Sequence, residues 1–232
     1  PRTFMDIAQL GAVREGEAVR VNLYAPFTAG FADVEVTLTG DFPVADKVTA
    51  KFAAKRPTAV KFRLPPWSRR TSFTVLPAGE PVVVTAGEWY ETQVPAGVTA
   101  VKVAFDMTPR LECSARAASD DRTDYRFGRW NGSGRDARRL YRTTPAARLF
   151  RGPLLLAKSK NVGDTAEDIL RADLNGGGWS VALRPIDDFR VMGAWEATFT
   201  RGGETYVTSV CDFPSAGDAL LPDGADQFSI FF

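Results

Sequence analysis

Residues 60–67, Val-Lys-Phe-Arg-Leu-Pro-Pro-Trp, decide the fold class of this chain. The three apolar residues that open the stretch alternate with Lys61 and Arg63, and successive side chains of a β-strand point to opposite faces. The pattern therefore predicts a half-buried strand with one dry face. The two prolines that follow cannot donate hydrogen bonds to a neighbouring strand, so pairing should stop there. Trp67 is then expected to be buried at the strand end.

The same alternation recurs before and after this stretch, with turn residues between the segments and no helical periodicity. In residues 18–24, for example, Val19 and Val21 fall on one face, and Arg20 and Tyr24 fall on the other. Strands are predicted in this half of the chain at 18–24, 33–39, 47–53, 59–64, 72–76, 81–85, 88–94 and 98–105.

The second half of the chain returns to strand patterns after an irregular segment. The apolar run at 149–157 predicts one strand buried on both faces, and Gly202-Gly203 predicts a hairpin turn between two strands. A helical turn is expected at 169–174. Further strands are predicted at 179–183, 195–200, 205–210 and 227–232.

Short strands separated by turns every 8–12 residues are typical of antiparallel sandwiches. We therefore expect an all-β chain of two antiparallel β-sandwich domains, jelly-roll-like in type. The first is predicted over 1–110, an arginine- and aromatic-rich loop over 111–148, and the second sandwich over 149–225. The strand at 226–232 is a candidate to return to the first sandwich.

The residues that are missing from the sequence exclude several kinds of catalytic site. The chain has no histidine, which removes Ser-His-Asp and Cys-His triads and histidine metal ligands. Its two cysteines, Cys113 and Cys211, are too far apart in sequence for a CxxC zinc motif. They are either two buried thiols or one disulfide. No catalytic residue, metal ligand or cofactor site is predicted, and whether the chain belongs to an enzyme stays open.

The charge balance argues against nucleic acid and membrane partners. The formal net charge is +1, which gives no global field to attract nucleic acid or an anionic membrane. No apolar run approaches the roughly 20 residues of a membrane span. Residues 1–20 lack a basic start followed by an apolar core, so no signal peptide is expected there, and the sequence indicates no compartment.

The segment from Arg122 to Arg151 holds nine arginines interleaved with aromatic residues. Such a mixture can stack on bases or sugars and bind phosphates. It is equally typical of a long solvated loop whose arginines pair with nearby aspartates, and we favour that interpretation.

Four aromatic residues are candidates for a sugar-binding surface, because sugars stack on exposed aromatic rings that have polar neighbours. They are Trp89, Tyr90, Trp130 and Trp195. Each could instead pack in the core or in a loop. The paired carboxylates of an autonomous glycosidase are not evident in the sequence, because the adjacent Asp187 and Asp188 would face opposite ways in an extended chain.

Five short segments, in order, carry a family resemblance. They are Val19-Arg-Val-Asn-Leu-Tyr24, Phe62-Arg-Leu-Pro-Pro-Trp67, Val103-Ala-Phe-Asp-Met-Thr-Pro-Arg110, Arg151-Gly-Pro-Leu-Leu-Leu-Ala157, and Asp212-Phe-Pro-Ser-Ala-Gly217 with Phe228-Ser-Ile-Phe231. They resemble segments of the β-L-arabinofuranosidase family, glycoside hydrolase family 127 and its relatives.

The resemblance implies that this chain corresponds to the C-terminal β-sandwich region of that family. In the family an (α/α)6 barrel precedes the region and carries the catalytic glutamate and a zinc-bound cysteine. No residue of this chain matches those positions. The resemblance therefore implies a non-catalytic β-sandwich region or subunit of a carbohydrate-active glycoside hydrolase, which supports a helical-barrel catalytic domain in cis or in trans and rims its substrate cleft. The alternative is a stand-alone carbohydrate-binding module.

Overall fold

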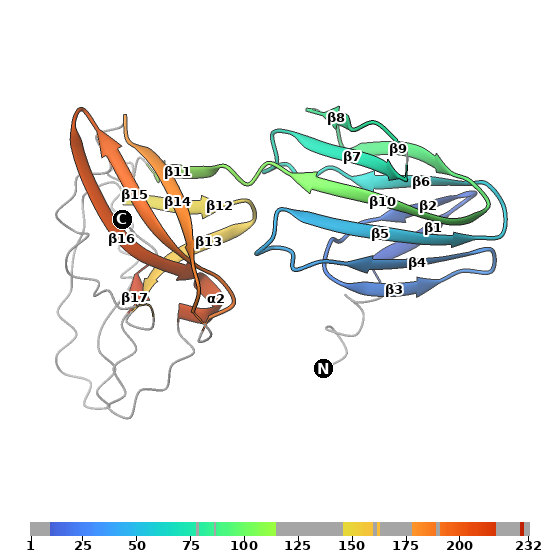
Figure 1. Cartoon of the computed structure of the whole chain (residues 1–232), viewed down its shortest axis with the longest axis horizontal. Helices are drawn as coiled ribbons and strands as arrows, with labels where there is room; N and C mark the ends of the chain where they lie inside the picture. The colour runs from blue at the N-terminus through green and yellow to red at the C-terminus, as the bar shows by residue number, and fades with distance from the viewer. Residues whose placement is uncertain are drawn as a thin grey trace, which may run out of the picture. The chain divides into compact units, whose positions relative to one another are not determined.

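The computed structural model describes residues 10–77, 79–85, 87–114, 146–159, 162, 178–188, 191–216 and 228–229. Almost all of the regular secondary structure in these residues is β-strand, which confirms the predicted all-β, sandwich-like fold class. The chain forms two compact units, Pro1–Met107 and Thr108–Phe232 (Figure 1).

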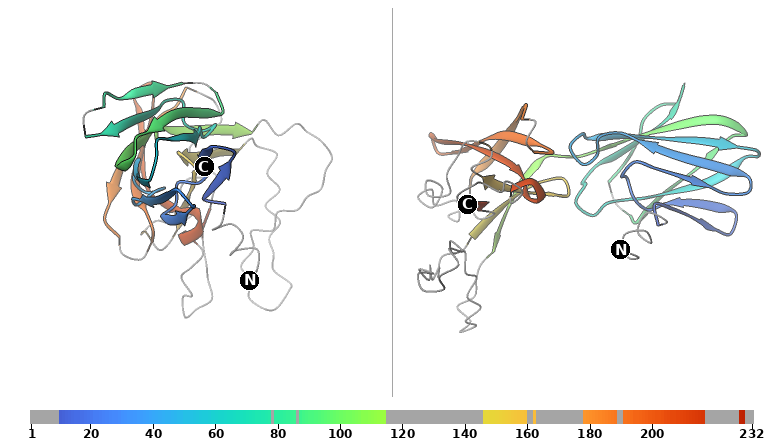
Figure 2. Two further views of the ribbon diagram at one scale, coloured as in Figure 1. Left: turned by 90° about the vertical axis from the view of Figure 1, so that its right-hand side faces the viewer. Right: turned by 90° about the horizontal axis from the view of Figure 1, so that it is seen from below.

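The first unit is built from two sheets that pack face to face (Figures 1 and 2). The four-stranded sheet has the order β1 (Ala12–Glu15), β2 (Ala18–Val21), β6 (Thr58–Arg63) and β9 (Trp89–Val94). The six-stranded sheet has the order β3 (Phe27–Gly30), β4 (Val34–Thr39), β5 (Lys47–Ala54), β10 (Gly97–Phe105), β7 (Thr71–Leu76) and β8 (Val82–Val84).

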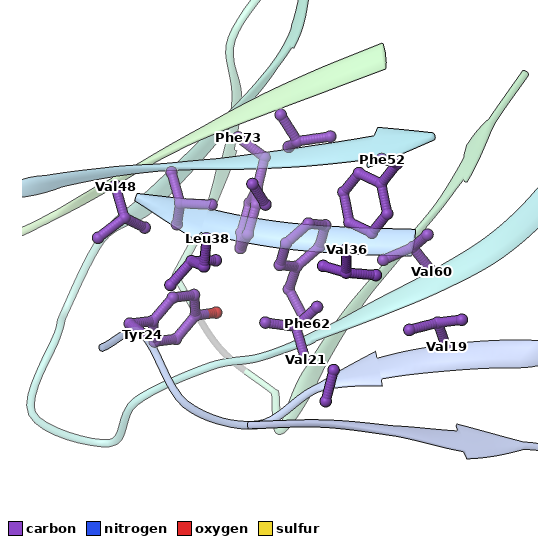
Figure 3. Close-up of a cluster of buried hydrophobic side chains, with 14 of the residues drawn as sticks. Val19, Val21, Tyr24, Val36, Leu38, Val48, Phe52, Val60, Phe62 and Phe73 are labelled. Atoms are coloured by element: carbon purple, nitrogen blue, oxygen red, sulfur yellow. The ribbon is translucent and has the colours of Figure 1, made fainter. Parts of the chain in front are cut away.

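The core of this unit lies between the two sheets (Figure 3). Phe62 on β6 is fully buried, as the alternation predicts, and it contacts rings from the opposite sheet. Its ring centroid lies 6.0 Å from that of Phe52 on β5 and 5.3 Å from that of Phe73 on β7. Burial of these three rings and the surrounding valines supplies the main hydrophobic stabilisation of the unit.

Three details of the first unit correct the sequence predictions. Alternation predicts Tyr24 on the polar face, but Tyr24 is only 6% exposed, because β2 ends at Val21 and the chain leaves the ladder before Tyr24. Trp67 packs on the core but is half-buried rather than fully buried. In addition, β2 pairs with β6 in parallel, so this sheet is not wholly antiparallel.

The second unit is built around one sheet that nearly closes on itself. Its order is β11 (Pro109–Ser114), β12 (Ala146–Arg151), β13 (Leu154–Ser159), β16 (Glu204–Asp212), β15 (Ala194–Arg201) and β14 (Ser180–Ile186). Strand β17 (Phe228–Ser229) pairs with β13, and the short helix α2 (Phe213–Ala216) follows β16. The terminal strand therefore pairs within the second unit and does not return to the first sandwich.

The apolar run at 149–157, predicted as one strand, is a hairpin between β12 and β13. Gly152 adopts a φ of 55°, a left-handed conformation that suits glycine, and Pro153 follows it in the turn. The hairpin at Gly202-Gly203 is confirmed: both glycines have positive φ, and Arg201 pairs with Glu204 around them.

The segment predicted as a loop at 111–148 begins and ends in paired strands. Residues 111–114 belong to β11 and residues 146–148 belong to β12. Residues 115–145, with most of the arginine-rich segment, and the helical turn expected at 169–174 lie outside the described residues.

Candidate functional site

The structure describes three of the four aromatic candidates for sugar binding, and they lie in two different units. Trp89 and Tyr90 begin β9 of the first unit, whereas Trp195 lies on β15 of the second. Trp195 is only 2% exposed, and the Arg151 guanidinium lies 5.2 Å from its ring centroid. It is therefore a buried packing residue and not a surface platform. Trp130 lies outside the described residues.

Tyr90 faces the interior of the first unit. Its ring stacks on that of Phe73, with centroids 4.1 Å apart and an angle of 18° between the planes. In the ladder it stands opposite Phe62, a fully buried residue, so the two side chains share the inner face. Tyr90 is therefore a partly buried member of the core and is not placed to contact a sugar.

Trp89, one residue earlier, faces the outer side of the four-stranded sheet. It is half-buried, and the Arg20 guanidinium lies 4.0 Å from its ring centroid, in a cation–π contact. Arg20 Nη1 also donates to Glu15 Oε1 at 2.7 Å. Arg20 Nε is buried without a hydrogen-bond acceptor in the part of the chain that the structure describes, as expected where a ring covers the guanidinium.

Beside Trp89, the ladder between β6 and β9 brings further charged side chains to the same outer face. The Leu64 N–H donates to the Glu88 carbonyl, so the next pair, Arg63 with Trp89, is a non-hydrogen-bonded pair whose side chains lie close together. Two residues further along, Lys61 Nζ lies 2.9 Å from Glu91 Oε1. We call the surface formed by Glu15, Arg20, Lys61, Arg63, Trp89 and Glu91 the Trp89 face.

The segments that carry the family resemblance make contacts of a different kind, which hold the fold together. The Tyr24 hydroxyl donates to the Arg63 carbonyl at 2.6 Å, and this joins the first of these segments to the second. Burial raises the pKa of the Tyr24 hydroxyl well above its ordinary value of 10.0, so it remains a neutral donor. The Tyr24 ring also contacts Phe105, of the third segment, edge-on at 4.7 Å between centroids.

In the second unit, Arg110 joins the third segment to the fourth. Its Nη1 donates to the Gly152 carbonyl at 2.7 Å, in the turn between β12 and β13. Its guanidinium also lies 4.7 Å from the Phe150 ring centroid, and its Nε donates to Glu112. Arg110 thus fixes the turn after β12 against β11.

In the fifth segment, Asp212 caps helix α2. Its fully buried carboxylate accepts hydrogen bonds from the Ser215 N–H at 3.1 Å and from the Ser215 hydroxyl at 2.8 Å. It also accepts one from the Gly193 N–H at 2.9 Å, which ties the cap to the start of β15. A buried carboxylate with three donors is a structural anchor.

Asp33 and Glu196 do not have the chemistry of the acid in a glycosidase carboxylate pair. Such a pair needs an acid whose pKa is raised, so that it holds a proton near neutral pH. The hydrogen bond from Arg56 lowers the pKa of Asp33, and the hydrogen bond from Arg184 lowers that of Glu196. Both groups are therefore committed to their ionised, arginine-paired forms.

The chemistry of Cys211 is equally unlike that of a nucleophile. It is a buried free thiol, and burial raises its pKa to about 12, with smaller contributions from Asp212 and Asp188. A thiol with this pKa is protonated at neutral pH and unreactive. Across the described residues, no group of three or more cysteine, aspartate or glutamate side chains is arranged to hold a metal ion. The described part of the chain also lacks any helix of the length and apolarity that crossing a membrane requires.

Comparison with known proteins gives matches by structure. No family model matches the sequence, and no curated protein matches it either. A solved structure described as a glycoside hydrolase matches with a TM-score of 0.67 and 15% identity. The structure of Ara127N-Se, a GH127 β-L-arabinofuranosidase from Geobacillus stearothermophilus T6, matches with a TM-score of 0.58 and 13% identity. The chain has the fold of part of a glycoside hydrolase.

The coverage of these matches is uneven. Each alignment includes 99% of this chain but only 38% of the first hydrolase and 36% of the second. This chain therefore spans less than two-fifths of the length of the solved proteins that share its fold. At these identities the likeness establishes the fold and no residue's role.

The Trp89 face could be predicted from the sequence only in part. The alternation of apolar and polar residues correctly predicts that the side chains of Lys61 and Arg63 point to the outer side of the sheet. The contact of Arg20 with Trp89 could not be predicted, because it depends on the order β2-β6-β9, in which segments far apart in sequence become neighbours. Arg20 and Arg63 are the residues of this face that a search for aromatic platforms misses.

Proposed function

We propose that this chain is a non-catalytic β-sandwich region or subunit of a carbohydrate-active glycoside hydrolase of the β-L-arabinofuranosidase kind. The observation that carries the proposal is the match of 99% of this chain to little more than a third of two solved proteins, one described as a glycoside hydrolase and the other as a GH127 β-L-arabinofuranosidase. A helical-barrel catalytic domain, in cis or in trans, would supply the chemistry. The β units would support that domain and rim its cleft.

The chemistry of the described residues supports a structural role. Three side chains within the segments that carry the resemblance form hydrogen bonds that stabilise the fold. They are those of Tyr24, Arg110 and Asp212. Cys211 is buried and protonated, and the carboxylates of Asp33 and Glu196 are held ionised by arginines. The two carboxylates therefore do not supply the protonated acid that a glycosidase requires, and the Cys211 thiol is not in the thiolate form of a nucleophile.

An assay of the purified chain tests the absence of catalysis. We expect no release of nitrophenol from p-nitrophenyl α- or β-L-arabinofuranoside above that of a heat-denatured control. Turnover that survives metal chelation and is abolished by a single Asp or Glu substitution in this chain would overturn the proposal.

The partner domain is tested on protein purified from its native source. Size-exclusion chromatography with light scattering should give a mass well above the 25.3 kDa of this sequence, with arabinofuranosidase activity in the same peak. A specific contact between separate chains would bury about 1,200 Å² or more in total. A lone 25.3 kDa monomer with no activity would favour the binding-module alternative, which the half-buried Trp89 on the outer side of its sheet also suits.

A further inference from the structure

One cation of the Trp89 face is left over when the charges of that face are paired. Arg20 pairs with Glu15, and Lys61 pairs with Glu91. The Arg63 guanidinium is exposed and makes no ion pair or hydrogen bond within the described part of the chain, although its carbonyl accepts from Tyr24. The face thus presents a guanidinium without an ion pair on the residue that stands opposite Trp89 in the ladder.

The scaffold beneath this pair holds it in place. The ladder between β6 and β9 fixes the spacing of Arg63 and Trp89, and Arg20 fixes the ring through the cation–π contact. The Tyr24 hydrogen bond anchors the Arg63 backbone from the inner side. The tryptophan ring, set on a strand and in contact with Arg20, therefore loses little conformational entropy when a ligand binds, whereas the exposed Arg63 side chain is ordered by its ligand.

The Trp89 ring and the Arg63 guanidinium favour different features in a ligand. A tryptophan ring stacks on the apolar C–H face of a sugar ring. A guanidinium with no carboxylate partner favours a carboxylate, which it binds through two parallel N–H···O bonds. A sugar that carries a carboxylate at the edge of its ring satisfies both groups at once.

We propose that the Trp89 face is a binding site for a uronic acid residue of an acidic polysaccharide. The sugar ring stacks on Trp89, and its carboxylate accepts hydrogen bonds from Arg63. Arg20 positions the tryptophan ring and does not touch the ligand. This inference rests on the proposed carbohydrate-active function, but binding would belong to the isolated chain and needs no barrel domain.

The charges of the face argue against two other ligands. A neutral sugar would use the tryptophan and leave the guanidinium without a partner. Nucleic acid binding depends on several cations along the phosphate backbone, whereas Arg63 is the one cation of this face without an ion pair among the described residues, and the net charge of the chain is +1. The face therefore fits a short anionic sugar segment better than a nucleic acid strand.

Isothermal titration of the full chain with trigalacturonic acid tests the proposal. The same trisaccharide as its methyl ester is the neutral comparison. We expect the acid to bind at low salt, the ester to bind about tenfold more weakly, and the acid's affinity to fall as salt is added. Trp89→Ala and Arg63→Gln should each weaken binding about tenfold, and Arg63→Lys should fall between Arg63→Gln and the parent chain.

Lys102→Gln is the matched control, because Lys102 is an exposed lysine without an ion pair in the described part of the chain and lies in the six-stranded sheet. It removes one positive charge and should leave the affinity unchanged. The Trp89→Ala variant is checked for folding by comparing its circular dichroism spectrum with that of the parent chain. Arg63→Gln changes an exposed residue, so its effect on affinity tests the proposal even if Trp89→Ala does not fold.

Three results would overturn the inference. They are no binding of the acid at millimolar concentration, equal affinity for acid and ester, and equal weakening by Lys102→Gln and Arg63→Gln. None of these results bears on whether the chain supports a catalytic barrel, so the two proposals fail separately.

Discussion

Replacing Tyr24 with phenylalanine tests whether the link between two of the resembling segments stabilises the first unit. The change removes one hydroxyl and keeps the ring, which contacts Phe105 at 4.7 Å and Phe42 at 6.2 Å between centroids. The Arg63 carbonyl then loses its hydrogen-bond donor. A lost hydrogen bond that leaves a partly buried acceptor without a partner costs about 1–3 kcal/mol, so we expect the free energy of unfolding to fall by about 2 kcal/mol.

The pH dependence gives a second, independent signature of the same hydroxyl. The pKa of Tyr24 is raised in the folded chain above the ordinary 10.0 of the unfolded one. Below pH 10 both states keep the proton and stability is unaffected. As the pH rises above 10, the unfolded state loses its proton while the folded state keeps it. Stability therefore falls by up to about 1.4 kcal/mol per pH unit until the folded pKa is reached.

The measurement is urea unfolding of the full chain, followed by tryptophan fluorescence, at pH 7 and at steps from pH 9 to 11. Tyr24→Phe should unfold at lower urea at pH 7 and should lack the tyrosine component of the alkaline decline. Tyr90→Phe is the matched control, because no hydrogen bond from its hydroxyl exists within the described residues, and it should change stability by less than about 0.5 kcal/mol. Equal effects of the two substitutions would refute the reasoning.

Three further substitutions or modifications test other contacts. Trp67→Ala should destabilise the first unit by about 2–4 kcal/mol. This is at the low end of the usual cost for a large aromatic residue, because Trp67 is half-buried against Phe42 and Phe105. A loss below about 1 kcal/mol in urea unfolding would show that this packing contributes little. Asp212→Ala should lower the free energy of unfolding by about 2–4 kcal/mol, because it removes a buried helix cap and leaves the Gly193 N–H without an acceptor. The amide hydrogens of Gly193 and Ser215 should then exchange faster, and those of the first unit should not. Alkylation of Cys211 by iodoacetamide at pH 8, followed by mass spectrometry, should be far slower in the native chain than in urea, and equal rates would contradict a buried thiol with a pKa of about 12.

Local patterns in the sequence predicted the strands well where a strand has one dry face. The alternation around Phe62, for example, matches the burial of β6 residue by residue. The same reasoning failed for Tyr24, because alternation applies only while the chain stays in the ladder, and β2 ends before that residue. It also failed for the run at 149–157, where a glycine and a proline between apolar residues form a turn that the hydrophobic pattern alone conceals.

The arrangement of the strands in space could not be predicted from local patterns. The parallel pairing of β2 with β6 joins residues about forty positions apart, and no turn sequence between them specifies it. The strands β1, β3 and β11 were not predicted, and two of them, β1 and β3, are only four residues long. Short strands carry too few alternating positions to stand out from a loop.

The contacts of the resembling segments explain why the resemblance predicts the fold better than the site. Hydrogen bonds within and between these segments join Tyr24 to Arg63, Arg110 to Gly152, and Asp212 to Ser215, and each stabilises the unit that contains it. A chain that keeps these pairs can build this fold while its exposed faces vary freely. The residues of the Trp89 face therefore have to be interpreted from their own charges and geometry. There, an anchored tryptophan beside an unpaired arginine favours an acidic sugar over a neutral one.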